Sequence, residues 1–326
     1  MRILLVDADS QKNFPNLALM KLSAYHKSLG DHIELIKGVP NTPPLVEYDA
    51  GYISCVFFQN MDKVHKYYKQ LSFPVTVGGS GWDHKKLSKD IEHIRPDYSL
   101  YDTDFSLGFT SRGCPNNCGF CIVPKKEGPI RDNAPITEFL HPEHNKLILL
   151  DNNFLASPKW KSNLEYLIDN KIKVNFNQGL DARILTEEHA KLLGETKLQS
   201  WKFNNRIVHF AFDDLRHKDK VLRAISLLRD VGIKGQDLVF YVLVGYDSTF
   251  AEDLERVNIL IENKVDPYIM KWNQRTDDSL LNHLARWVNR RHFRKYDFFD
   301  YDSGDSKQVI AEYLAQGCPQ RAFRGA

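Results

Sequence analysis

Short hydrophobic runs alternate with stretches of helical periodicity over the first hundred residues. The run RILLVD at 2–7 is continuously apolar and ends in an acid, as buried parallel strands do. Residues 17–29 have helical spacing, and Gly30 is placed to end that helix. This alternation predicts an open, doubly wound parallel sheet. The other expected elements are strands at 32–37, 51–58, 74–79 and 96–101 and a helix at 61–71.

A second series of strand–helix units begins near Phe105. The hydrophobic segments between the expected strands each carry one apolar helical face, and Thr249 and Glu252 form a capping box before one of them. Six units are too few for a closed eight-unit barrel, so the series predicts a partial, open barrel. The six expected strands are at 105–110, 146–151, 173–177, 207–212, 238–245 and 267–271.

The pattern becomes helical and then irregular after about residue 275. The stretch RWVNRRHFRK at 286–295 holds five basic residues and no acid, and aromatic residues follow it. A basic segment rich in aromatic residues can bind nucleic acid. The alternative is a surface helix whose arginine stems cover an apolar seam of Leu284, Trp287 and Val288. We favour the surface helix.

Composition and charge exclude several classes of protein. The chain has 326 residues, of which 42% are hydrophobic and 26% charged, so it can bury a core and is not generally disordered. Its formal net charge of +2 excludes a histone-like or strongly acidic protein. No apolar run approaches the ~18 residues of a membrane-spanning helix, and Asp7 and Asp9 come too early for a signal peptide. We therefore expect a cytoplasmic protein without a membrane partner.

Three of the five cysteines lie in one short segment, SRGCPNNCGFC. Cys114, Cys118 and Cys121 are spaced C-x3-C-x2-C directly after an expected strand. The glycines, proline and asparagines between them predict a loop that can wrap around a ligand. Thiolates a few residues apart in such a loop can reach different corners of one iron–sulfur cluster. Three thiolates leave one iron of a four-iron cluster without a protein sulfur, and that iron is open to a substrate or cofactor.

Two other interpretations of the cysteine segment stand beside the cluster. A structural zinc ion needs four ligands, and His141 or His144 could supply the fourth. Zinc pairs are usually spaced C-x2-C, however, whereas here an x3 pair is joined to an x2 pair. The third interpretation is three buried cysteines without a ligand. We favour the cluster.

The cysteine spacing, with aromatic Phe120 before the last cysteine, resembles the signature of the radical S-adenosylmethionine (SAM) superfamily, and residues 104–275 resemble its partial barrel. The resemblance implies that Cys114, Cys118 and Cys121 hold a 4Fe-4S cluster whose open iron binds the amino and carboxylate groups of SAM. It implies reductive cleavage of SAM to a 5′-deoxyadenosyl radical, which abstracts hydrogen from a substrate. It also implies that Phe120 lies near the adenine, and that a reductant protein such as flavodoxin or ferredoxin supplies the electron.

The resemblance extends to polar residues at the ends of the second and third strands. The sequence Asp151-Asn152-Asn153-Phe154 is similar to the Asp-Asp-x-Phe of several subfamilies, which implies that Asn152 and Asn153 receive the SAM amino group. The alternative is an Asx turn at the strand end. Arg183 follows the third strand, where some members place a basic group for the SAM carboxylate. The alternative is an ordinary surface arginine.

The fourth and fifth strands end in two further positions that the resemblance implies. Asp213 lies where relatives often have an acid near the ribose; the alternative is a helix N-cap, and Asp214 competes for either role. Gly245 in VLVGYDST is similar to the family's glycine motif beside the adenine, although Ser248 replaces the usual Glu. These positions are consistent with ligand binding at the carboxyl ends of parallel strands.

Residues 1–100 resemble the cobalamin-binding-type domain that precedes many radical SAM barrels. The glycine pair Gly78-Gly79 after a strand supports the resemblance. The motif Asp-x-His-x-x-Gly is absent, because the loop after the first strand reads DADSQKN and has no histidine. We therefore expect a degenerate domain that does not bind cobalamin and that shapes the substrate cavity or docks a partner.

The remaining cysteines limit the chemistry further. Cys55 and Cys318 are too few to hold a second cluster in the usual way. Cys55 lies in an apolar strand and is expected to be a small core residue, whereas Cys318 is expected to be exposed.

Together these observations predict an α/β chain with three parts: a Rossmann-like, cobalamin-binding-type domain at 1–100, a partial (β/α)6 radical SAM barrel at 104–275, and a helical or irregular extension at 276–326. The predicted function is a radical SAM enzyme acting on a nucleic acid, a peptide or a small metabolite. The rival is a non-catalytic zinc- or iron–sulfur-binding interaction module. The basic stretch at 286–295 favours a nucleic acid, but the net charge does not.

Overall fold

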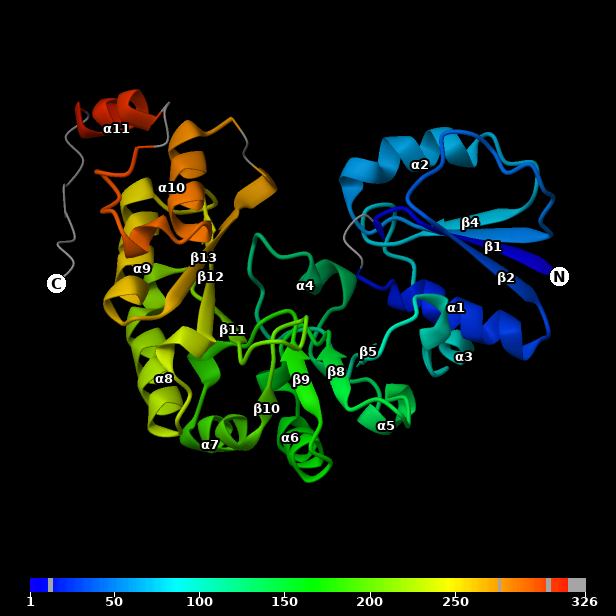
Figure 1. Cartoon of the computed structure of the whole chain (residues 1–326), viewed down its shortest axis with the longest axis horizontal. Helices are drawn as coiled ribbons and strands as arrows, with labels where there is room; N and C mark the ends of the chain where they lie inside the picture. The colour runs from blue at the N-terminus through cyan, green and yellow to red at the C-terminus, as the bar shows by residue number, and fades with distance from the viewer. Residues whose placement is uncertain (11–13, 275–276, 303–305, 316–326) are drawn as a thin grey trace. The chain divides into compact units, whose positions relative to one another are not determined.

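The structure is a computed structural model that describes residues 1–10, 14–274, 277–302 and 306–315 (Figure 1). The chain divides into two compact units. The first comprises Met1–Phe109 and Ala134–Leu147, and the second comprises Thr110–Asn133 and Ile148–Ala326. Both units contain parallel sheets with helices between the strands. The mixed α/β class predicted from the sequence is therefore confirmed.

The first unit contains a four-stranded parallel sheet of order β2-β1-β3-β4. In β1, Ile3 and Leu5 pack toward α1, whereas Leu4 and Val6 pack toward α2 (Figure 1). Successive side chains of a strand point to opposite faces, so a strand covered by helices on both sides is apolar at every position. The elements are β1 (Arg2–Asp7), α1 (Leu17–Ser28), β2 (His32–Lys37), β3 (Ala50–Ser54), α2 (Met61–Tyr68), β4 (Val75–Gly78), α3 (Lys89–Glu92) and α5 (Ile136–Phe139).

The strand expected at 96–101 is wrong. Tyr98–Leu100 form the 3-10 helix η3, and the Asp97 side chain caps it by accepting hydrogen bonds from the Ser99 backbone N–H and hydroxyl. Asp and Ser compete in this way with strand hydrogen bonds, and the hydrophobic pattern does not record that competition.

All six strands expected after residue 105 are present. The short strand β10 was not expected. It pairs in parallel with β9 through Lys197 and Leu198. The strands are β5 (Ser106–Gly108), β8 (Lys146–Leu149), β9 (Lys173–Phe176), β10 (Lys197–Leu198), β11 (Val208–Ala211), β12 (Leu238–Val244) and β13 (Asp266–Lys271).

These strands form two sheets, of order β10-β9-β8-β5 and β11-β12-β13. β8 begins in the first unit and ends in the second. A parallel bridge between Leu180 and Phe210 joins the chain after β9 to β11. β11, β12 and β13 also pair in parallel, so the carboxyl ends of these three strands point the same way.

The two faces of the β11-β12-β13 sheet differ. Phe210 and Phe240 are fully buried on one face, where their rings stack. On the other face, Tyr241 lies beside Tyr268, which is 45% exposed. The helices of this region are α6 (Trp160–Asp169), α7 (Glu187–Glu195), α8 (Lys218–Asp230) and α9 (Phe250–Glu262). The predicted capping box of Thr249 and Glu252 begins α9 and is confirmed.

The basic stretch at 286–295 begins in the last turn of α10 (Ser279–Asn289) and continues through the 3-10 helix η9 (His292–Arg294). Leu284, Trp287 and Val288 are buried, so the surface helix with an apolar seam is confirmed. Arg291 and Arg294 both form ion pairs with Asp266 of β13. The last described helix is α11 (Ser306–Ala315). Among the described helices, none is long and apolar enough to cross a membrane.

We expect His209 to make folding stability depend on pH. Its ring stacks on Tyr241 with centroids 5.0 Å apart, and Nδ1 is buried without a hydrogen-bond partner among the described residues. Burial lowers the pKa of His209 to about 4. The unfolded chain therefore takes up a proton near pH 6.5 that the folded chain excludes, and stability falls as the pH drops from 6.5 toward 4.

The test compares urea unfolding of the wild-type protein and His209→Phe at pH 7.5 and pH 5.0. The wild-type protein should lose about 2 kcal/mol more of its free energy of unfolding than the variant between these pH values. Equal losses in the two proteins would show that His209 does not contribute to the pH dependence.

Candidate functional site

The cysteine segment is the connection of a short antiparallel hairpin in the second unit. β6 (Ser111–Arg112) pairs with β7 (Arg131–Asp132), and α4 (Val123–Lys126) follows the last cysteine. Gly113 has φ +85°, and a Cβ there would lie 2.2 Å from the Pro129 carbonyl oxygen. Only glycine allows this close approach of the two backbones.

The residues after β8 hold the start of the cysteine loop. The buried Asp151 carboxylate accepts hydrogen bonds from the backbone N–H and hydroxyl groups of Thr110 and Ser111, at 2.6–3.1 Å. Burial raises the pKa of Asp151, and these four donors oppose that rise. The amide oxygen of Asn152, expected to face SAM, accepts a hydrogen bond from the Gly113 N–H at 3.0 Å. Asn152 therefore supports the loop backbone.

The cysteine thiols share one electrostatic environment. Burial raises the pKa of Cys118, and the Arg183 guanidinium opposes that rise, while the nearby Cys114 thiol adds to it. Burial also raises the pKa of Cys121, opposed by the Val123 N–H, which donates to Cys121 Sγ at 3.4 Å. Cys114 and Cys118 contribute to that rise as well. The three thiols are thus close enough to influence one another, and none forms a disulfide.

Arg183 forms a two-point ion pair with Asp181 beside Cys118. Its Nε and Nη2 atoms each lie 2.7 Å from an oxygen of the Asp181 carboxylate. Burial disfavours the charged form of Asp181, but Arg183 outweighs it and lowers the pKa of the carboxyl. The Arg183 side chain is 27% exposed, so it is a half-buried ion-pair partner and not an unpaired surface arginine.

Asp181 also contacts two asparagines that face Cys114. The Nδ2 atoms of Asn116 and Asn153 lie 3.0 and 3.1 Å from Asp181 Oδ2. The same two atoms lie 3.6 and 3.5 Å from Cys114 Sγ. Asn153 Oδ1 is buried and has no hydrogen-bond partner in the described part of the chain.

Asp213 and Asp214 have different hydrogen-bond partners. Asp213 lies after β11 and accepts a hydrogen bond from the Leu243 N–H at 2.9 Å. Burial raises the pKa of Asp213, and that N–H opposes the rise. Asp214 caps the 3-10 helix η6 (Leu215–His217) by accepting from the Arg216 N–H at 2.9 Å. The N-cap alternative considered for Asp213 therefore applies to Asp214.

Tyr246, which follows β12, connects Phe120 to the last strands. The Phe120 and Tyr246 rings pack edge to face with centroids 5.5 Å apart, and a Cβ on Gly119 would lie 2.3 Å from the Tyr246 hydroxyl. Tyr246 also packs against Trp272. Gly245 does not contact the cysteine loop through any described hydrogen bond.

A buried ion pair holds the Gly245 backbone in place. Its N–H donates to Asp253 Oδ2 at 3.1 Å, and Asp253 pairs with Arg256. Arg256 is fully buried and donates to the Phe212 carbonyl oxygen at 3.0 Å. This pair sets the position of the loop that carries Tyr246.

The structure thus brings together most of the residues that the sequence singled out. Cys114, Cys118 and Cys121 interact with Asn153, Arg183 or Asp213, while Phe120 and Gly245 flank Tyr246 and Asn152 holds the loop. Sequence analysis missed three residues: Asn116, Asp181 and Tyr246. Asp181 could have been found from the sequence, because it follows an expected strand, as Asp213 does.

The described residues include no group of three or more His, Cys, Asp or Glu side chains arranged to hold one metal ion. A structural zinc ion requires four ligands around a single point, whereas the thiolates of a cluster bind separate irons. The Nδ1 atom of His144, which was considered as a fourth zinc ligand, lies 3.0 Å from the Ser106 hydroxyl oxygen. Its ring also packs against Tyr98.

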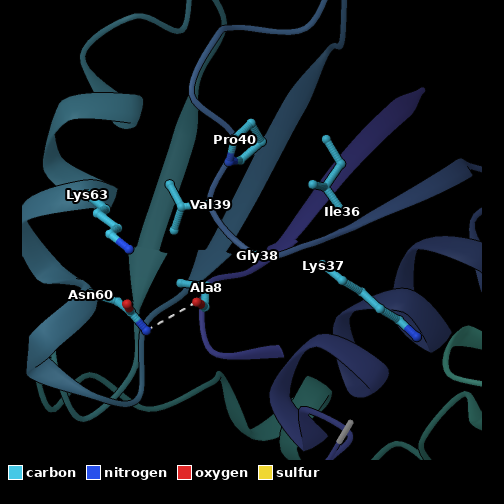
Figure 2. A pocket seen from close by; sticks show the side chains of 8 residues that line it. All are labelled: Ala8, Ile36, Lys37, Gly38, Val39, Pro40, Asn60 and Lys63. Carbon is cyan, nitrogen blue, oxygen red and sulfur yellow. Dashed lines mark hydrogen bonds between the residues drawn. The ribbon is translucent and has the colours of Figure 1, made fainter. Parts of the chain in front are cut away.

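The first unit has a cavity of about 250 Å³ at the carboxyl ends of β1 and β2 (Figure 2). Ala8, Gly38, Asn60 and Lys63 are among its lining residues, and the Asn60 amide donates to the Ala8 carbonyl oxygen at 3.2 Å. No lining residue is a histidine. Cys55, in the same unit, is fully buried as expected, and burial raises its pKa to about 11. Cys318 lies outside the described residues.

No protein-family model and no curated protein matches the chain. Among solved structures, the crystal structure of Streptococcus suis SuiB is similar at 14% identity, with a TM-score of 0.41, over 72% of this chain and 58% of SuiB. The crystal structure of the same protein bound to S-adenosylmethionine gives 14% identity and a TM-score of 0.36, over 81% and 57%. The chain therefore spans less than two thirds of SuiB. A likeness of this size supports no conclusion about function.

Gly113 and Gly128 provide a test of the loop geometry. Both have positive φ, but a Cβ on Gly128 would meet nothing within 4 Å. We expect Gly128→Ala to cost about 1–2 kcal/mol of the free energy of unfolding, from the left-handed backbone alone. Gly113→Ala should cost about 1–3 kcal/mol more, because its Cβ overlaps the backbone of Pro129. Urea unfolding of both variants measures the difference, and equal costs would contradict the described loop.

Proposed function

We propose that this chain is a radical SAM enzyme. In this proposal Cys114, Cys118 and Cys121 bind a 4Fe-4S cluster, and the enzyme cleaves SAM reductively to modify a nucleic acid, a peptide or a small metabolite. One observation carries the proposal: the three free cysteines of the C-x3-C-x2-C segment lie in one loop between β6 and β7, and the side-chain amides of Asn116 and Asn153 contact Cys114 Sγ there. A reductant protein such as flavodoxin or ferredoxin would supply the electron.

The donor set fits such a cluster. The cysteines are partly exposed and free, and N–H groups already point at two of their sulfurs. N–H donors stabilise the negative charge of cluster thiolates. Asn153 Oδ1 is a buried acceptor without a partner in the described chain, and such an atom is costly to leave unpaired. When bound, the cluster would supply one electron and an open iron for the amino and carboxylate groups of SAM.

The surrounding residues can bind and orient SAM. Arg183 keeps a positive charge beside Cys118 and is placed to attract the SAM carboxylate. The Asp213 Oδ1 atom accepts a hydrogen bond from the Leu243 N–H, so Oδ2 is the oxygen that would accept a hydrogen bond from a ribose hydroxyl. Phe120 and Tyr246 offer aromatic faces for the adenine, and Asn153 offers an amide oxygen to the amino group.

The proposed layout follows from the strand order. Residues 104–275 would form the partial barrel, because their six strands occur in sequence and those described as pairs are parallel. The strand β10, which pairs with β9, is an addition to the six expected strands. Residues 1–100 would form a degenerate cobalamin-binding-type domain that shapes the cavity or docks a partner, and 276–326 would form an extension. A cytoplasmic location is part of this proposal.

The proposal is tested by replacing each of the three cysteines with alanine. Anaerobically reconstituted wild-type protein should contain four irons and four sulfides per chain. With SAM and dithionite it should release 5′-deoxyadenosine. Each of Cys114→Ala, Cys118→Ala and Cys121→Ala should reduce that release to background, because a required ligand is missing.

Cys55→Ala is the matched control. It also removes one thiol, but Cys55 lies in the core of the first unit and should not affect cluster loading. A wild-type protein that bound zinc and no sulfide would support the rival interaction module instead. Normal SAM cleavage by Cys118→Ala would contradict the ligand assignment.

A further inference from the structure

Resting on the proposed function, we propose that Asn116 and Asn153, oriented by Asp181, donate hydrogen bonds to Cys114 Sγ and thereby raise the reduction potential of the cluster. The three side chains come from the cysteine loop, from the end of β8 and from the end of β9. They are positioning residues, because they act on the cluster through a ligand sulfur. This task is separate from any contact with SAM.

Cys114 receives three N–H donors. The backbone N–H of Asn116 lies 3.5 Å from Sγ, its side-chain Nδ2 lies 3.6 Å away, and Nδ2 of Asn153 lies 3.5 Å away. Two of these donors belong to side chains from different segments of the chain, the cysteine loop and the residues that follow β8. Their convergence on one sulfur therefore needs an explanation beyond loop folding.

Asp181 determines the orientation of both amides. An amide NH2 group has two hydrogens, and in each asparagine one is directed to Cys114 Sγ and the other to Asp181 Oδ2. Turning either amide over would place its oxygen against a carboxylate and a sulfur, which both accept hydrogen bonds. Asp181 remains ionised because Arg183 lowers its pKa against the effect of burial. The donors therefore stay directed at the sulfur.

Asn153 shows that this orientation is maintained at a cost. Its side chain is nearly inaccessible to solvent, and Oδ1 finds no partner within the described residues. A buried unpaired amide oxygen is unfavourable. The two contacts of Nδ2 oppose that loss, because hydrogen bonds to ionised acceptors are stronger than those between neutral groups.

The three cysteines are not equivalent in their surroundings. Cys114 has three neutral amide donors, Cys121 accepts from the N–H of Val123, and Cys118 has the Arg183 guanidinium nearby. Hydrogen bonds to the cysteine sulfurs are one of the factors that set the potential of a cluster. They favour the reduced state, because that state places more negative charge on the sulfurs. Loss of the buried donor should therefore make reduction harder.

The experiment measures the midpoint potential of the reconstituted full-length chain without SAM, by redox titration followed by EPR. We expect Asn153→Ala to reduce the equilibrium constant for one-electron reduction about tenfold, a shift of about 59 mV to more negative potential. Asn116→Ala should shift it in the same direction by less, because its backbone N–H remains. A merely structural role would change loading or stability without moving the potential.

Asn175→Ala is the matched control. Asn175 is an equally buried asparagine whose amide donates to the Gln199 carbonyl oxygen, and among the described cysteines it contacts no sulfur. Its substitution should leave the potential unchanged. Loaded Asn153→Ala with the wild-type potential would overturn this inference and leave the proposed function intact. A wild-type protein that assembles no cluster would overturn both.

A second measurement does not depend on any variant. Wild-type protein labelled with nitrogen-15 only at the side-chain amide of asparagine should show a nitrogen-15 coupling in pulsed EPR of the reduced cluster, because the Nδ2 atoms of Asn116 and Asn153 contact Cys114 Sγ. This measurement decides the question if Asn153→Ala fails to retain its cluster. The absence of such a coupling would overturn the inference.

Discussion

The Asp181 carboxylate is the acceptor on which the arrangement of the site depends. It follows β9, caps the 3-10 helix that begins at Ala182 and binds Arg183 through two hydrogen bonds. It also accepts hydrogen bonds from the amides of Asn116 and Asn153. A buried carboxylate of this kind requires an opposing charge, and Arg183 supplies it. The same ion pair places a cation beside Cys118 and two amides beside Cys114. One interaction thus determines the polarity around two thiols.

The cysteine loop is fixed from two sides by separate strands. At its start, Asp151 and Asn152 bind backbone groups up to Gly113. At the other side, Phe120 packs on Tyr246, whose loop is held by a buried ion pair. A glycine-rich loop has little intrinsic preference for one conformation. The contacts from the strand ends therefore hold the loop in one conformation, which its own sequence does not do.

Much of the architecture could be predicted because burial on both faces leaves a clear pattern. The continuous apolar run of β1 and the six later strands follow directly from that rule. The failures were short elements. The 3-10 helix at Tyr98–Leu100 is capped by a carboxylate, and β10 is a two-residue strand that pairs with β9. Local hydrogen bonds and pairing with neighbouring strands determine the secondary structure of such short segments. Neither leaves a periodic pattern of hydrophobic residues in the sequence.

The sequence by itself determined the strands, the spacing of the three cysteines and the placing of Arg183 and Asp213 after strand ends, because periodicity and spacing are local properties. Only the tertiary structure decided what those residues contact. It turned Asn152 toward the Gly113 backbone, directed Asn153 to a cysteine sulfur, and brought in Asp181, which no motif had singled out. Partners of this kind lie many residues apart in the chain, and they meet only when parallel strands bring their carboxyl ends together.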